Sequence, residues 1–362
     1  MAAIQQQSGN ISIPSTFIWP DNEKPSLDVP SLQVPIINLN RILNGDVEVD
    51  SDEVSRTLKL VNEACRKHGF FVIMNHGVEQ DLIEIAHKQY DQFFSLPLEE
   101  KDKANTKSGE YRGKYSGGFG NRFASKKPWK EDVSFRYCND LGDDNSIVHN
   151  YFVDIMGQDF DNFGRVYQEY CEAMYGVTMK VAELLDKSLG LEKCYTKFFE
   201  KMDSIMKLNY YPACPNPELT LGVGQHTDPT SITILHQDNV GGLQVFVNGE
   251  WQAISPVADA FIVNLGDTFT ALSNGIYSSC LHRVVTNTHT GRKSLTFFVS
   301  PLNNTVIKPP EELMLKYKEE CKTRHFPDFT WSDFYVFTQK HYRPDTNTFK
   351  AFIEWSKQQE KA

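Results

Sequence analysis

Hydrophobic positions follow a helical period in the first half of the chain and a period of two after residue 205. In the first half, apolar side chains recur every three to four residues in three stretches, at 51–67, 82–94 and 163–189. Gly69, Pro97 and Gly190 follow these stretches and predict where each helix stops. Leu82, Ile85, Phe93 and Phe94 are the residues expected on the buried side of the second helix. Two apolar runs, 34–39 and 70–74, predict strands between the helices.

The alternating pattern after residue 205 predicts a series of short strands. Expected strand residues are Leu219, Leu221 and Val223, Ile232 and Ile234, Leu243, Val245 and Val247, and the runs 261–265, 280–285 and 294–300. Asn248-Gly249 is typical of a tight hairpin turn. Many short strands with such turns favour an antiparallel sandwich or a jelly-roll barrel. Helices after about residue 310, including Phe334 and Phe337, are expected to pack on its outside.

A glycine-rich segment at 105–128 interrupts the periodic pattern. It lacks the Gly-Lys-Ser/Thr sequence of a phosphate-binding loop and is not framed by a strand and a helix. Two interpretations remain open for it, a lid over a pocket and an ordinary surface loop.

Charge and composition narrow the class of partner. The 362 residues carry 37 basic and 47 acidic side chains, a formal net charge of −10, which disfavours a nucleic-acid ligand. No apolar run is long enough to cross a bilayer, the first ten residues do not resemble a secretion signal, and the seven cysteines form no Cys-x-x-Cys pair. We therefore expect a cytoplasmic protein that binds a small molecule and neither nucleic acid nor membrane. The oligomeric state stays open.

Two histidines and an aspartate in the β-rich region have the pattern of a metal site. His226 and Asp228 are two residues apart, so in an extended segment their side chains point the same way, and His282 lies in a later predicted strand. Two imidazoles and one carboxylate form a facial triad, which leaves three neighbouring positions of an octahedral Fe(II) for a chelating co-substrate and oxygen.

Arg292 and Ser294 share a strand face and suggest what the co-substrate is. A guanidinium directed into a barrel is costly unless an anion meets it, and its planar fork matches a carboxylate. A dicarboxylate that chelates the metal and meets Arg292 and Ser294 with its far end fits this pattern. One alternative is that Arg292 pairs with an internal acidic residue. A zinc hydrolase would leave Arg292 and Ser294 without a role, and a non-catalytic binding module predicts the loss of at least one of the five residues.

The same region carries motifs that resemble plant 2-oxoglutarate- and iron(II)-dependent dioxygenases. The motifs are VPIINL (34–39), HGFFVIMNHGV (68–78), NYYPACPNPE (209–218), HTDPTSITILHQD (226–238), GGLQVF (241–246), LGDTFTALSNGIYSSCLHRVV (265–285) and RKSLTFF (292–298). Within that family the chain is similar to gibberellin 20-oxidases through FIWPDNEKPS (17–26), KPWKEDVSFRY (127–137), VYQEYCEAM (166–174) and FTQKHYRPD (337–345).

This resemblance implies a distorted double-stranded β-helix core flanked by helices. It divides one compact unit into a tail (1–33), a helix-rich region that packs on the core (34–200), the catalytic core (201–305) and a helical end (306–362). It implies Fe(II) held by His226, Asp228 and His282, with no other catalytic residue. It also implies 2-oxoglutarate on Arg292 and Ser294 with Tyr211 and Asn209 nearby, O2 as oxidant and ascorbate as reductant.

The resemblance further implies oxidation of C-20 of C20 gibberellins in successive steps toward C19 gibberellins. These are apolar carboxylic acids, and the residues expected to contact one are Trp129, Lys130, Phe135 and Arg136. The chain departs from the gibberellin 20-oxidase pattern at Lys127, Asp132 and Thr227, which stand where that family has Leu, Thr and Cys. A related dioxygenase that hydroxylates or desaturates another terpenoid or a flavonoid is the alternative.

Overall fold

Two facing β-sheets form the centre of the molecule. The computed structural model describes residues 13–43, 51–106, 111–117, 126–140, 146–341 and 347–359. The large sheet has eight strands in the order β1-β2-β10-β7-β12-β5-β4-β3, and the small sheet has four in the order β6-β11-β8-β9. Their bounds are β1 Ile36–Asn38, β2 Phe70–Met74, β3 Gly113–Ser116, β4 Glu131–Cys138, β5 Asp203–Tyr211, β6 Val223–His226, β7 Ile232–Gln237, β8 Leu243–Val247, β9 Glu250–Ala253, β10 Phe261–Leu265, β11 His282–Val284 and β12 Arg292–Ser300. This is the predicted β-rich fold, a double-stranded β-helix.

The long strand β12 fixes the middle of the large sheet, because it pairs antiparallel with β5 along its whole length and with β7 on its other side. Alternate residues of these strands point into the space between the sheets, and the others point to the helices. The region before residue 200 also supplies strands. β1 and β2 extend one edge of the large sheet, and β4 and β3 extend the other. The core sheet is therefore completed by residues far away in sequence.

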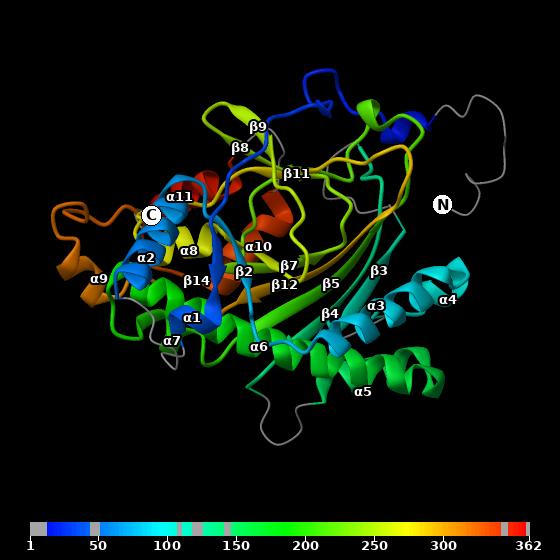
Figure 1. The fold of residues 1–362 in the computed structure, drawn as a ribbon, viewed down its shortest axis with the longest axis horizontal. Helices are drawn as coiled ribbons and strands as arrows, with labels where there is room; N and C mark the ends of the chain where they lie inside the picture. The colour runs from blue at the N-terminus through cyan, green and yellow to red at the C-terminus, as the bar shows by residue number, and fades with distance from the viewer. Residues whose placement is uncertain are drawn as a thin grey trace.

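Helices cover the outer face of the large sheet (Figure 1). The longest is α6 (Asp161–Leu189), which contacts α2 (Ser51–Lys67), α3 (Gln80–Ser95) and α5 (Ile147–Met156). Short helices α1 (Leu39–Leu43), α4 (Leu98–Asp102), α7 (Cys194–Phe198) and α8 (Asp267–Leu272) join these elements to the sheets. The buried side chains of α6 and the outer face of the sheet form one continuous apolar core. None of the helices among the described residues is long and apolar enough to cross a membrane.

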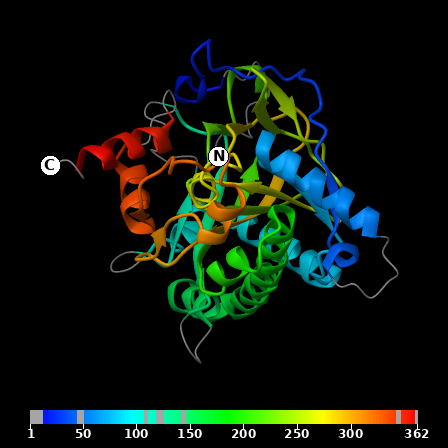
Figure 2. The ribbon, with the colours of Figure 1, turned by 90° about the vertical axis from the view of Figure 1, so that its left-hand side faces the viewer.

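The end of the chain forms a separate helical layer. It contains α9 (Glu311–Lys316), the two-stranded sheet of β13 (Val306–Ile307) and β14 (Phe329–Thr330), α10 (Trp331–His341) and α11 (Thr348–Gln359). Phe334 and Phe352 are fully buried between α10 and α11. In Figure 2, α10 and α11, in orange and red, lie on the opposite side of the molecule from α2, in blue.

Several predicted elements have the predicted positions, and a few differ. The helices that stop at Gly69 and Gly190 and the Asn248-Gly249 hairpin are present. Ile85 is 45% exposed, because α3 presents Ile83, Ala86 and Tyr90 to the core in its place. Leu219 lies in a short 3-10 helix, so the expected alternation begins only at β6. The glycine-rich segment contains a strand, β3, while its residues 107–110 and 118–125 lie outside the described residues.

The first described residues are packed, in contrast to the tail predicted for 1–33. Ile13, Phe17 and Trp19 are all buried. The ring of Phe17 meets Trp129 edge to face at 5.1 Å between centroids. The aromatic residues Phe17 and Trp19 could have indicated this packing. The prediction of a tail relied instead on the Gln, Ser and Pro content of the segment.

Candidate active site

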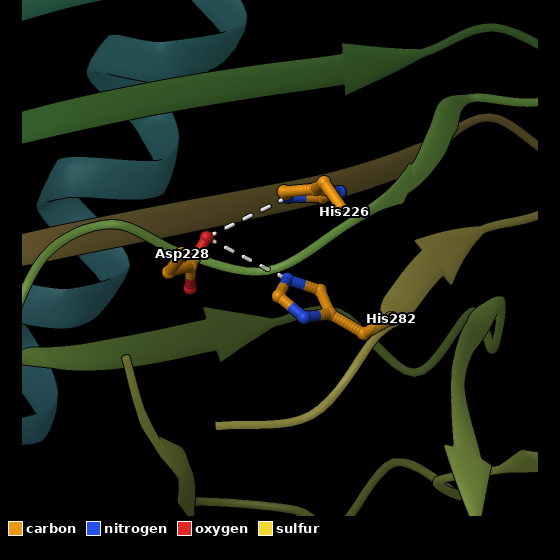
Figure 3. Close-up of side chains that lie close together, drawn as sticks. All are labelled: His226, Asp228 and His282. Atoms are coloured by element: carbon orange, nitrogen blue, oxygen red, sulfur yellow. Dashed lines mark ion pairs between the residues drawn. The ribbon is translucent and has the colours of Figure 1, made fainter. Parts of the chain in front are cut away.

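His226, Asp228 and His282 meet between the two sheets (Figure 3). His226 at the end of β6 and His282 at the start of β11 are direct cross-strand partners, and their rings are 4.2 Å apart. Asp228 Oδ1 lies 3.6 Å from Nε2 of each imidazole. Candidate ligand atoms of the three residues all lie within 4.8 Å of one another. Asp228 follows the end of β6, so its position depends on the loop after the strand and not on the predicted strand alternation.

The hydrogen bonds of the triad leave the inward atoms available to a cation. His226 Nδ1 faces the carbonyl oxygen of Gly224 at 2.8 Å, and His282 Nδ1 faces that of Cys280 at 3.2 Å. Nδ1 therefore carries the proton in each ring, and Nε2 presents a lone pair. Asp228 Oδ2 accepts hydrogen bonds from the side chains of Thr233 and Asn264, which leaves Oδ1 toward the imidazoles.

Asp228 is held as a carboxylate despite its burial. Burial acts to raise the pKa of Asp228, but the neighbouring imidazoles of His282 and His226 and the hydrogen bonds from Asn264 and Thr233 outweigh it, so its pKa lies below the ordinary value. A carboxylate oxygen and two imidazole nitrogens are a suitable donor set for Fe(II). The residues present therefore fit the metal that the family uses.

The loop that carries Asp228 is clamped by residues 266–268. Asp267 N donates to Asp228 O at 2.8 Å, and Gly266 N donates to Ser231 O at 2.9 Å. The Thr268 hydroxyl donates to Pro229 O at 2.6 Å. Thr227 donates its hydroxyl to Asp267 Oδ2 at 2.8 Å. These four hydrogen bonds hold the loop in place beyond the end of β6, where strand pairing no longer fixes the backbone.

A cavity of about 650 Å³ opens beside the triad and contains the side chains expected to bind the co-substrate. Arg292 and Ser294 of β12 line it together with Asn209 and Tyr211 of β5. Arg292 is 2% exposed, and among the described residues it forms no ion pair with a carboxylate. Its Nη2 donates to the neutral Gln237 Oε1 at 2.7 Å, and its Nε is buried without an acceptor. The alternative of an internal acidic partner for Arg292 finds no support in this geometry, whereas an anionic ligand would satisfy it.

Asn209 and Tyr211 contact Ser294 and Arg292, the two residues expected to bind the co-substrate. Tyr211 and Arg292 are cross-strand partners, and the guanidinium lies 5.1 Å from the centre of the tyrosine ring. Asn209 faces Ser294 in the next row of the sheet, with its Nδ2 3.4 Å from the serine hydroxyl. Asn209 Oδ1 accepts a hydrogen bond from Lys130 Nζ at 3.0 Å.

Only one of the four expected substrate residues lines the cavity. Lys130 does so, but Trp129 packs outside it and donates its indole N–H to Pro212 O. Phe135 is fully buried in the main core against Phe152. Arg136 is held by both carboxylate oxygens of Asp203. The structure thus places three of these side chains away from the site.

The cavity also has lining residues that the sequence interpretation missed. Among them are Tyr111, Lys114, Lys207, Tyr335, Thr338 and Lys340. Alternation along β5 was an available signal for Lys207, since it lies two residues before Asn209. No comparable signal pointed to the side chains of α10.

The fold and the site together define a non-haem iron oxygenase. The model of the 2OG-Fe(II) oxygenase superfamily matches residues 202–301, and a model described as the N-terminal region of a non-haem dioxygenase in morphine synthesis matches residues 34–153. The chain is 52% identical to gibberellin 20 oxidase 1 of Arabidopsis thaliana, with 95% of this chain and 89% of that protein covered. It is 49% identical to gibberellin 20 oxidase 1-A of Triticum aestivum, with 98% and 94% covered. The chain therefore belongs to the 2OG-Fe(II) oxygenase superfamily and, within it, to the gibberellin 20 oxidase family.

Solved structures share the whole fold. The crystal structure of JOX2 in complex with 2OG, Fe and JA matches with a TM-score of 0.76 and 28% identity, covering 96% of this chain and 95% of that one. A dioxygenase for auxin oxidation from rice matches with a TM-score of 0.69 and 23% identity over 85% of this chain and 95% of that one, a likeness of fold. Fe(II) and 2-oxoglutarate are the metal and co-substrate of this class.

Proposed function

We propose that this chain is a gibberellin 20-oxidase that oxidises C-20 of C20 gibberellins in successive steps toward C19 gibberellins. The observation that carries the proposal is the 52% identity to a gibberellin 20 oxidase over 95% of the chain. The cavity supports it, because about 650 Å³ lies within the range of small-molecule sites and the cavity borders the triad directly.

His226 Nε2, Asp228 Oδ1 and His282 Nε2 would hold the metal in this proposal. When bound, Fe(II) supplies the activation of O2 that turns 2-oxoglutarate into succinate and CO2 and adds one oxygen atom to a C–H bond of the substrate. The protein fixes the ligand geometry through the Gly224 and Cys280 carbonyl oxygens and the clamp on the Asp228 loop.

Arg292 and Ser294 would bind the far carboxylate of 2-oxoglutarate. A guanidinium that already donates one N–H to Gln237 still offers a fork of donors to a carboxylate. The Tyr211 ring keeps that fork from turning, and Asn209 orients the Ser294 hydroxyl. The co-substrate would then approach the triad with its keto-acid end, because its other end is fixed on β12.

The test is an assay of purified protein with Fe(II), ascorbate, 2-oxoglutarate and a C20 gibberellin. We expect succinate formation that depends on the gibberellin, together with alcohol, aldehyde and C19 products in mass spectra. His226→Ala and Asp228→Ala should abolish both, whereas His289→Ala, which alters an exposed histidine, should not. The proposal fails if gibberellins leave succinate formation unchanged, and turnover of a flavonoid in the same assay would favour the related dioxygenase.

A further inference from the structure

Positive charge gathers in the part of the cavity beyond the co-substrate residues. Among the described residues that line it, Lys114, Lys130, Lys207 and Lys340 are cationic there, and Asp132 is the single carboxylate apart from Asp228 of the triad. They come from β3, the residue before β4, β5 and α10, so they converge from different elements. A charge excess in a partly enclosed cavity attracts an anionic ligand.

Strand register places two of these lysines, Lys114 and Lys207, one row away from Asn209 and Ser294. Lys114 of β3 faces Ser134 of β4, and Ser134 faces Lys207 of β5. The neighbouring row contains Asn209 and Ser294. Side chains on the same face of a strand are about 7 Å apart, so the lysine row is close to the co-substrate site but distinct from it.

Asp132 anchors this cluster and leaves it cationic. Its Oδ1 lies 2.9 Å from Lys130 Nζ, and its Oδ2 lies 3.9 Å from Lys207 Nζ. Burial acts to raise the pKa of Asp132, but Lys130 and Lys207 outweigh it, so its pKa lies below the ordinary value. One carboxylate thus faces two ammonium groups.

Apolar side chains also line the cavity beside the lysine row. Ile205 and Phe298 are cross-strand partners that line the cavity in the row beyond Lys207, and Leu235 lines it on the other side of Thr296. A ligand that satisfies both surfaces has an apolar body and a carboxylate on one side.

We propose that Lys207, together with Lys114, binds the carboxylate of an apolar carboxylic acid substrate, and that Asp132 positions Lys207. The inference rests on the proposed function for the identity of the acid, since gibberellins belong to this chemical class. Arg292 and the lysine row then bind two different carboxylates in one cavity. The substrate acid and 2-oxoglutarate do not compete, and the acid fixes which carbon faces the triad.

The test measures binding of a C20 gibberellin and of its methyl ester to the protein loaded with Fe(II) and 2-oxoglutarate without oxygen. Loss of one charged hydrogen bond should weaken binding of the acid to Lys207→Gln by about tenfold or more, and binding of the ester should stay unchanged. Lys114→Gln should show a smaller loss of the same kind. Lys207→Arg should retain the preference for the acid.

Lys318→Gln is the matched control, because it removes the same charge from an exposed residue that does not line the cavity. All variants should keep the wild-type KM for 2-oxoglutarate in the reaction without substrate, which shows that the fold and the co-substrate site are intact. Equal affinity of the wild type for the acid and its methyl ester would overturn the inference. So would a Lys207→Gln variant whose ratio of affinities for acid and ester equals that of the wild type.

Abietic acid and its methyl ester separate this inference from the proposed function. If gibberellins do not bind, but abietic acid binds better than its ester and loses that preference in Lys207→Gln, the gibberellin assignment fails and the carboxylate subsite stands. If gibberellins are oxidised but the preference does not depend on Lys207, the subsite fails alone. Binding of neither acid overturns both.

Discussion

The surroundings of Arg292 indicate which kind of ligand this side chain binds. Its side chain is almost fully buried, it donates to an amide, and its Nε lacks an acceptor. A buried cation of this kind is costly unless a ligand supplies the anion. In the proposed function the far carboxylate of 2-oxoglutarate offsets this cost, and that role can be measured separately from metal binding.

Arg292→Lys should raise the KM for 2-oxoglutarate roughly tenfold to a hundredfold, because an ammonium cannot donate through a planar fork. Metal affinity should stay within about twofold, since the triad is untouched. Steady-state kinetics and titration with Fe(II) measure the two effects. Arg165→Lys, in an exposed ion pair with Asp161, is the control. An unchanged KM would contradict the role of Arg292.

His236 is a second buried group whose protonation state matters, this time for stability. It lies on the helix-facing side of β7, and its Nδ1 is 2.9 Å from His87 Nε2 of α3. Burial lowers the pKa of His236 from 6.5 to about 3, with smaller contributions from His87 and His76. Folding therefore selects the neutral ring.

Stability should fall as the pH drops from about 6.5 toward 3, because the unfolded chain binds a proton at His236 before the native protein does. At pH 4 this one residue should reduce the free energy of unfolding by roughly 3 kcal/mol. His236→Gln should flatten that part of the profile in urea titrations, whereas His289→Gln, at an exposed position, should not. If the free energy of unfolding falls with pH in parallel for wild type and His236→Gln, protonation of His236 does not destabilise the native protein.

At the scale of elements, the contact between the Asp228 loop and the start of α8 decides the metal geometry. β6 ends at His226, so the third ligand needs support from outside its strand. A side chain at Gly266 would place a Cβ 2.0 Å from Thr230 O and 2.7 Å from Asp228 O. These are backbone atoms, so the loop itself would have to move.

Gly266→Ala should therefore weaken Fe(II) binding by about tenfold or more, because the third ligand shifts. Isothermal titration with Fe(II) under anaerobic conditions measures the effect directly. Gly176→Ala in α6 is the matched control, since a Cβ there meets nothing within 4 Å. That control should bind metal normally and be stabilised by about 0.5–1 kcal/mol. Normal metal affinity in Gly266→Ala would show that the clamp is not needed.

At the scale of the whole molecule, the helical layer at the end of the chain completes the cavity wall. Tyr335, Thr338 and Lys340 of α10 line the cavity, while the opposite face of α10 packs on α11. Phe352 of α11 is fully buried among aromatic rings that include Phe334 and Phe337. The position of the wall thus depends on packing about 15 residues further along the chain.

Phe352→Ala should destabilise this layer by about 3–5 kcal/mol through lost contacts and a cavity. The KM for the organic substrate should rise, while the KM for 2-oxoglutarate stays near the wild-type value because β5 and β12 are not involved. Thermal unfolding and steady-state kinetics measure the two effects. Trp355→Ala, a more exposed neighbour at 41%, should have a smaller effect on both. An equal rise in the KM for the organic substrate and the KM for 2-oxoglutarate would show that the helical layer also stabilises the β-sheet core.

Local patterns predicted the elements and much of the site. They failed where tertiary packing decides which of two similar neighbouring residues is buried or lines the cavity. Strand alternation, side-chain chemistry and the family motifs together grouped His226, Asp228, His282, Arg292 and Ser294 as candidates. The sequence pattern placed Ile85 of α3 on the buried side, which is wrong, because Ile83 faces the core and both fit an apolar stripe. It also could not distinguish Lys130, which lines the cavity, from its neighbour Trp129, which does not.

The sequence by itself determined a core of short antiparallel strands, the metal-binding residue types and the acidic co-substrate, because these depend on periodicity and on side-chain chemistry. Tertiary structure alone decided which lysines face the cavity, what holds Asp228 beyond its strand and which helix closes the wall. These features depend on contacts between segments far apart in the chain. The sequence pattern of one segment cannot predict these features, because the contacts form only when the sheets and helices pack together.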